Sequence, residues 1–141
     1  LTIADSYSST KSGNLANYYA AICLMNLGSS DSLEYYNDAL KSLSNFNTDD
    51  EILHSLSTGL KGDANLELGN VTQALNFYEL AASDKKNEFT TPYFLMKQAF
   101  IHEKNENYSK ALDIYKSIQR EYPDSKEGLD IEKYISSASN R

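Results

Sequence analysis

The chain has 141 residues and carries 13 Lys and Arg against 20 Asp and Glu, which gives a formal net charge of −7. This length fits one domain with a continuous core. Nucleic-acid-binding proteins concentrate basic residues on one face, so the acidic balance argues against nucleic acid and favours an apolar or weakly basic partner. No segment reaches the roughly 18 apolar residues that a membrane span needs.

Residues 1–13 are rich in Ser, Thr and Gly, and we expect a flexible segment or the end of a preceding helix there. From Asn14 to Leu27, apolar residues surround most of a helix, which indicates packing on more than one side. Gly28 ends this helix. Cys23 is the single cysteine, and its apolar neighbours predict a buried side chain rather than a reactive thiol.

A second helix, over about residues 31–43, completes the first pair. Its apolar residues recur at spacings of three and four, namely Leu33, Tyr36, Leu40 and Leu43. Asp49 or Asp50 is placed to cap a third helix that runs to Leu68. The third helix contains Gly59 and Gly62, and each costs about 1 kcal/mol relative to alanine, so a neighbouring helix is expected to press against that spot.

The C-terminal half contains three further helices and a cap. A fourth helix covers residues 71–83, and a polar loop over residues 84–90 leads to Thr91-Pro92, which predicts a cap followed by proline at the first helical position. That fifth helix runs to about Lys104. The sixth covers residues 108–121 and ends because proline at 123 disfavours helical geometry in the residue before it.

A final helix over residues 124–138 is predicted from Asp124 and Glu127, which have capping-box spacing. Its polar side is expected to stay exposed, as the terminal cap of a stacked helical protein requires. The residues expected on its buried side are Ile131, Tyr134, Ile135 and Ala138.

A segment of the chain is repeated. Residues 69–81 are similar in sequence to residues 106–118, with substitutions at most positions. Both copies place a small residue, Ala74 or Ala111, where two helices must approach closely, and a tyrosine follows four residues later. Gly28 aligns with the Gly69 position in a more divergent first copy. Helix pairs that recur at a period of about 34 residues are typical of tetratricopeptide repeats.

The chain therefore resembles tetratricopeptide repeat proteins. The resemblance implies an all-α, helix-turn-helix solenoid of about three helix pairs plus a C-terminal capping helix. The domain covers residues 14–141, with repeats at about 14–46, 49–83 and 91–121 and the capping helix at 124–138.

Three segments are also similar to membrane-anchored, periplasm-facing tetratricopeptide proteins of the bacterial cell envelope, of Bacteroidetes type. They are residues 14–19, 62–70 and 122–128. This likeness implies a scaffold in envelope assembly or a chaperone partner. It favours the cell envelope over the cytoplasm, with an anchor preceding Leu1.

No residue pattern points to catalysis, a cofactor or a metal. His54 and His102 are the only histidines, and neither has a second ligand at a metal-binding spacing. A Gly-x-Ser-x-Gly turn and a glycine-rich phosphate loop are both missing from the sequence. We therefore expect a non-enzymatic protein without cofactor or metal.

In the resembled family, the first helix of each pair lines a concave peptide-binding groove. Carried onto this chain, those positions are Tyr18, Ile22, Met25, Asp63, Leu66, Glu67, Tyr93, Met96, Phe100 and Glu103. The set is apolar with acidic edges, so an apolar or weakly basic peptide is favoured. The alternative is that these residues pack within the core.

Two roles remain open from the sequence. The preferred one is a non-enzymatic scaffold that binds another protein through its concave face. The alternative is a structural spacer or self-association unit of a longer membrane-anchored protein. A homodimer in solution would favour this alternative.

Overall fold

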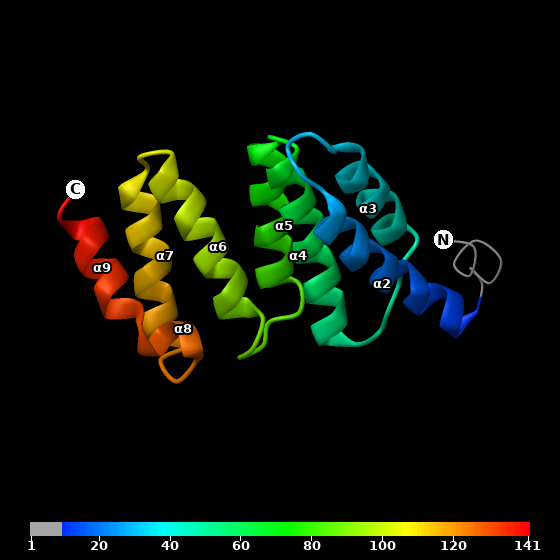
Figure 1. Ribbon diagram of the computed structural model, residues 1–141. Coiled ribbons are helices and arrows are strands. Elements are labelled where there is room, and N and C mark those ends of the chain that lie inside the picture. The colour runs from blue at the N-terminus through cyan, green and yellow to red at the C-terminus, as the bar shows by residue number, and fades with distance from the viewer. Residues whose placement is uncertain (1–9) are drawn as a thin grey trace. The chain divides into compact units, whose positions relative to one another are not determined.

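The computed structural model describes residues 10–141, and over this range the chain is all-α, with eight helices and no strand (Figure 1). The expected fold class is thus confirmed. The expectation for residues 1–9 lies outside the described range. The helices are α2 (Lys11–Leu27), α3 (Glu34–Ser44), α4 (Glu51–Glu67), α5 (Val71–Ser83), α6 (Thr91–Lys104), α7 (Tyr108–Glu121), α8 (Lys126–Leu129) and α9 (Ile131–Ser139).

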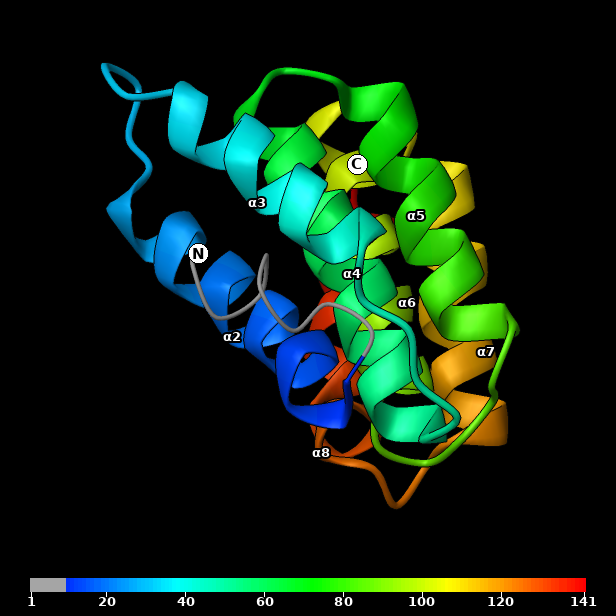
Figure 2. The same ribbon diagram turned by 90° about the vertical axis from the view of Figure 1, so that its right-hand side faces the viewer.

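The chain forms two compact units, Leu1–Phe77 and Tyr78–Arg141, and the boundary falls within α5. In the N-terminal unit α2 packs against α3, and α3 packs against α4 (Figure 2). The centre of the α2–α3 contact is a cluster of Ala21, Ala39 and Leu43. The two alanines are fully buried, so the helices approach closely at this point.

The first helix begins earlier than expected. Thr10 is its N-cap, and the Thr10 hydroxyl accepts a 3.0 Å hydrogen bond from the Gly13 backbone. Because this cap satisfies a free N–H group, residues 11–13 are helical rather than part of a flexible segment. The prediction of a buried Cys23 is wrong, since its side chain is exposed. The buried side of α2 is made by Gly13, Asn17 and Ala21.

The second and third helices also differ in part from expectation. α3 begins at Glu34 rather than near Asp31, and Leu33, expected in the core, is exposed at the N-cap. For α4, the expected cap is confirmed at Asp50, whose side chain accepts a 2.8 Å hydrogen bond from the Leu53 backbone. The two internal glycines, Gly59 and Gly62, are buried, as a close helix contact requires.

The turns after α4 and α6 share one backbone pattern. Gly69 and Glu106 both have positive φ, at 81° and 60°. The next residue in each case donates a backbone hydrogen bond across the turn, from Asn70 to Asn65 at 2.8 Å and from Asn107 to His102 at 2.7 Å. This 6→1 bond with a left-handed residue is the Schellman motif, which satisfies carbonyls at a helix end.

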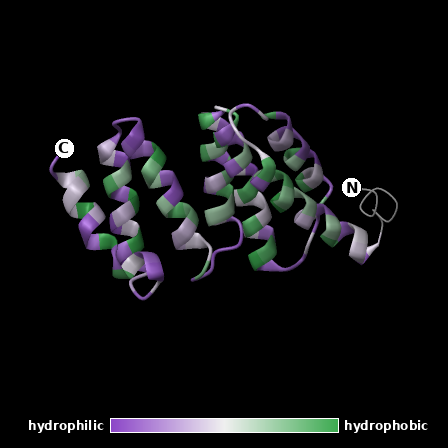
Figure 3. Cartoon of the chain, in the orientation of Figure 1, coloured by the Kyte–Doolittle hydropathy of each residue, from purple (hydrophilic) through white to green (hydrophobic). Residues whose placement is uncertain are grey.

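In the C-terminal unit α7 packs against both α6 and α9. Ala111, Tyr115 and Ile118 of α7 are completely buried in its core, together with Ala99 of α6 and Ile131 of α9. Ala74 and Tyr78 of the other repeated segment are also buried, so the expected alanine and tyrosine pattern is confirmed in both copies. The turns that join the helices are mostly hydrophilic (Figure 3).

Two helix starts in this unit differ from the prediction. The N-cap of α6 is Thr90, and Thr91 is already helical. The Thr91 hydroxyl instead accepts from the Asn87 backbone at 2.9 Å and donates to the Ala82 carbonyl at 3.1 Å, which ties the loop to the end of α5.

The predicted capping helix is interrupted. Its cap is Ser125 rather than Asp124, because the Ser125 hydroxyl accepts from the Gly128 backbone at 2.9 Å. The short α8 ends at Leu129, with Asp130 as its C-cap, and α9 begins at Ile131. Ile131 and Ala138 are buried as expected, whereas Tyr134 and Ile135 are half-buried against the same core.

Candidate peptide-binding surfaces

The expected groove residues of the N-terminal unit are divided between core and surface. On α2, Tyr18 and Met25 pack against the buried alanine cluster, and Ile22 is half-buried. The Tyr18 ring lies 5.2 Å from the Phe46 ring, centroid to centroid. Burial raises the pKa of the Tyr18 hydroxyl, and neighbouring Tyr19 adds to the effect.

The three expected positions on α4 are less buried. Asp63 is half-buried, and Leu66 and Glu67 are exposed near the end of the helix. Lys61, two residues before Asp63, places its ammonium 6.0 Å from the centroid of the Phe77 ring. Charged groups of both signs therefore lie on this helix beside apolar side chains.

In the C-terminal unit α6 presents two aromatic rings to solvent. Tyr93 and Phe100 are 42% and 44% exposed, and they lie seven residues apart on the helix. Met96 lies between them in sequence but is buried in the core. Met96 is therefore a packing residue, and the rings of Tyr93 and Phe100 are the exposed part of this stripe of α6.

Phe100 belongs to an aromatic cluster built from three helices. Its ring lies 5.6 Å from Tyr134 of α9, and Tyr134 lies 5.6 Å from Tyr115 of α7. The Tyr115 hydroxyl is buried and has no hydrogen-bond partner at acceptable geometry. Burial strongly raises its pKa, and the nearby carboxylate of Glu103 raises it further. The half-buried Glu103 thus lies beside the cluster as a negative charge.

The exposed ring of Tyr93 already has a positive neighbour. The Lys97 ammonium lies 5.2 Å from the Tyr93 centroid and 5.4 Å from that of Tyr78. These distances fit cation–π attraction, which is favourable by about 0.5–1 kcal/mol at exposed sites. The N-terminal half of α6 therefore places exposed Tyr93 beside the ammonium group of Lys97.

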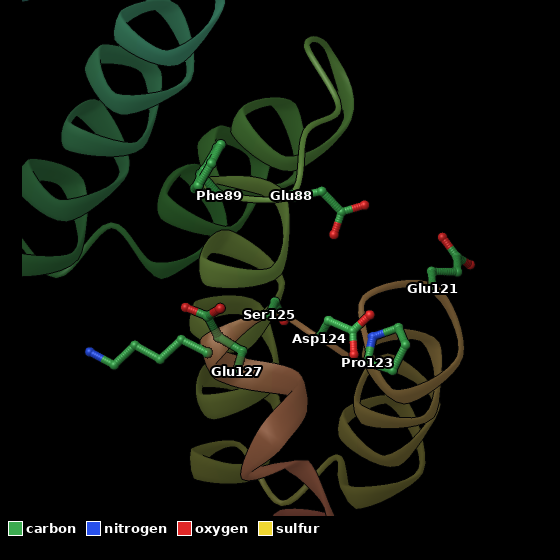
Figure 4. A pocket seen from close by; sticks show the side chains of 8 residues that line it. Glu88, Phe89, Glu121, Pro123, Asp124, Ser125 and Glu127 are labelled. Atoms are coloured by element: carbon green, nitrogen blue, oxygen red, sulfur yellow. The ribbon is translucent and has the colours of Figure 1, made fainter.

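A further hollow lies between the loop before α6 and the segment after α7 (Figure 4). Its volume is about 760 Å³. The lining contains four carboxylates and one ammonium and is therefore acidic; its residues are Glu88, Phe89, Glu121, Pro123, Asp124, Ser125, Lys126 and Glu127. The sequence pattern did not predict this hollow; its visible signal was Phe89, a phenylalanine in a polar loop.

Among residues 10–141, no group of three or more His, Cys, Asp or Glu side chains is placed to hold a metal ion. His102 is half-buried, and burial together with Lys110 lowers its pKa.

Within the described part of the chain, none of the helices has the length and hydropathy required to cross a membrane.

Comparison with known proteins gives one match. Residues 93–125, which cover most of α6, all of α7 and the turn to Ser125, match a family model described as tetratricopeptide repeat. No curated protein and no solved structure matches the chain. The match includes the fully buried Ala111 and Tyr115. It supports a tetratricopeptide repeat protein, with the α6–α7 pair as its most typical repeat.

Proposed function

We propose that this protein is a non-enzymatic module that binds another protein or a peptide through the first helices of its pairs. The observation that carries the proposal is the pair of exposed rings, Tyr93 and Phe100, on the first helix of the matched repeat. Large aromatic side chains provide much of the binding energy in protein interfaces, because they bury a large area at low entropic cost.

Charge favours an apolar or weakly basic partner. The chain carries a net charge of −7, and Glu103 lies beside the aromatic cluster that contains Phe100. A lysine or arginine next to an apolar anchor would meet both an aromatic face and a carboxylate. An acidic peptide would instead be repelled at long range.

A displayed library of random short peptides, selected on the immobilised chain, tests this proposal. Enriched peptides should combine apolar residues with Lys or Arg, and Phe100→Ala should weaken their binding by about tenfold. Leu80→Ala is the matched control, because Leu80 is similarly exposed on α5 and lies outside the expected groove. Equal binding to the wild type and to the Phe100→Ala and Tyr93→Ala variants would overturn the proposal. Met96 is unsuitable for this test, since its truncation would disturb the core.

The cellular setting is the finer part of the proposal. We place the module in the bacterial cell envelope, facing the periplasm, where it would act in envelope assembly or with a chaperone. Support comes from the sequence likeness of residues 14–19, 62–70 and 122–128. Fractionation of the source cells, followed by detection of the chain, tests this location, and recovery in the cytoplasm alone would contradict it.

A further inference from the structure

The acidic hollow of the C-terminal unit has an exposed aromatic ring in its lining. Phe89 is 79% exposed, although its loop is otherwise polar, and apolar atoms form more of the wall than polar atoms do. Figure 4 shows Phe89 and Glu127 on one side of the hollow and Glu88, Glu121 and Asp124 on the other. An aromatic ring in water lacks the favourable free energy of burial, so a partner that covers Phe89 gains it on binding.

The loop that carries Phe89 is held by side-chain hydrogen bonds. The Asn87 side-chain oxygen accepts from the Phe89 backbone at 2.9 Å, and the Thr91 hydroxyl donates to the Ala82 carbonyl at 3.1 Å. The ring therefore projects from a backbone that is already ordered. Because binding does not have to order this loop, less of the interaction free energy is lost to conformational entropy.

The charge of the hollow favours a cationic occupant. Its lining contains four carboxylates against one ammonium group. One of these carboxylates, that of Glu121, already accepts a 3.0 Å hydrogen bond from the guanidinium of Arg120, and both side chains are exposed. In the described part of the chain no three acidic side chains converge on one point as metal ligands do, so the carboxylates suit a larger, molecular cation.

Arginine is the cationic side chain that matches both features of the hollow. Its guanidinium is planar, so it can stack on an aromatic face while its N–H groups donate to carboxylates in pairs. A lysine ammonium is a compact, strongly hydrated charge and lacks this stacking surface. A ring on one side and carboxylates on the other therefore favour arginine over lysine.

We propose that the acidic hollow binds an arginine side chain from a basic segment of a partner protein, with the guanidinium between the Phe89 ring and the carboxylates of Glu88 and Asp124. Charge complementarity and the exposed ring in the wall identify this occupant. The site shares no residue with the expected groove, and neither proposal requires the other. Exposed charges are screened by salt, so the affinity should fall as ionic strength rises.

Fluorescence anisotropy with a labelled peptide of glycine, serine and two arginine residues tests the proposal. The wild type should bind this peptide, should bind its lysine version more weakly, and should not bind its glutamate version. Phe89→Ala should weaken binding of the arginine peptide by about fivefold through loss of the ring. Glu88→Gln combined with Asp124→Asn should weaken it by about tenfold through loss of two charges.

Matched controls exist for both kinds of change. Tyr19→Ala also removes an exposed ring, 57% exposed on α2. Glu79→Gln combined with Asp113→Asn also removes two exposed carboxylates, and both residues lie outside the lining. The controls should bind the arginine peptide like the wild type. A wild type that does not bind it, or Phe89→Ala and charge variants that bind it as well as their controls, would overturn the proposal.

Amide chemical shifts of the labelled chain give the location of the peptide directly. Shifts on titration should concentrate at residues 88–90 and 121–127, and shifts confined to residues 93–103 would overturn the proposal. The probe peptide lacks the apolar residues that the groove proposal requires, so Phe100→Ala should bind it like the wild type. Failure of this site would thus leave the groove proposal intact, and failure of the groove would leave this one intact.

Discussion

The turn after α2 differs physically from the turns after α4 and α6, although the sequence aligns all three. Gly28, after α2, has a φ of −65°, which any residue can adopt. Gly69 has a φ of 81°, in the region that favours glycine. A Cβ atom at Gly28 would overlap the ring of Tyr36, whereas a Cβ atom at Gly69 would meet nothing within 4 Å. The two glycines therefore occupy aligned positions for opposite reasons.

This difference separates the first helix pair from the other two. The turns after α4 and α6 share the same backbone hydrogen bonds, and Glu106 takes the left-handed conformation that glycine takes at position 69. The turn after α2 is instead defined by the close approach of the Tyr36 ring. Glycine at aligned positions of two repeats can thus be required for a left-handed backbone in one repeat and for the absence of a side chain in the other.

The largest expected effect comes from Gly28→Ala. Because Tyr36 is buried and its ring has little room to move, the added methyl group should lower the free energy of unfolding by about 2 kcal/mol through overpacking. Urea denaturation of the variant and the wild type measures this difference. A loss below about 0.5 kcal/mol would mean that space is not what requires glycine here.

Gly69→Ala should have a smaller effect of a different kind. The site has space for the methyl group, so only the left-handed conformation is penalised, and we expect a loss of about 1 kcal/mol. Gly69→Asn is the control, because asparagine tolerates this conformation better than alanine and should lose less. Equal losses for both variants would argue against a purely conformational cost.

The smallest predicted effect is a gain in stability. Glu106 has a φ of 60°, and Glu106→Gly relieves the strain of a side chain in that conformation. Part of the gain is offset because glycine makes the unfolded chain more flexible, so we expect about 0.5 kcal/mol of net stabilisation. Thermal denaturation measures it. A destabilised Glu106→Gly variant would show that the glutamate side chain contributes more than its backbone strain costs.

Helix positions in the repeated segments could be predicted from sequence, whereas the orientation of α2 could not. The bounds of α5 and α7 match the predicted ranges, because alanine and tyrosine spacing and Pro123 define them. On α2, apolar residues surround the helix, so the sequence does not indicate which side is buried. Tertiary packing determines the buried side: it buries the polar Asn17 and leaves Cys23 exposed.

The candidate surfaces were predictable only in part. The spacing of the expected groove residues on α6 follows one stripe of the helix, but it could not tell that Met96 would be buried while Tyr93 and Phe100 stay exposed. That outcome depends on how α7 and α9 cover the helix. The acidic hollow is formed by two loops that are distant in sequence, around residues 88–89 and 121–127, and no local pattern relates them.

The loop before α6 has one more consequence, and it concerns chemical ageing. The Asn87 amide oxygen accepts from the backbones of Phe89 and Thr90, at 2.9 and 2.8 Å. Its NH2 group donates to the Lys85 carbonyl and to the Thr90 hydroxyl, at 2.9 and 2.6 Å. Deamidation of Asn87 would keep the two hydrogen bonds that its side-chain oxygen accepts. It would replace the NH2 group by a carboxylate oxygen, which cannot donate to the Lys85 carbonyl. The shape of this loop over time therefore depends on a single side chain remaining an amide.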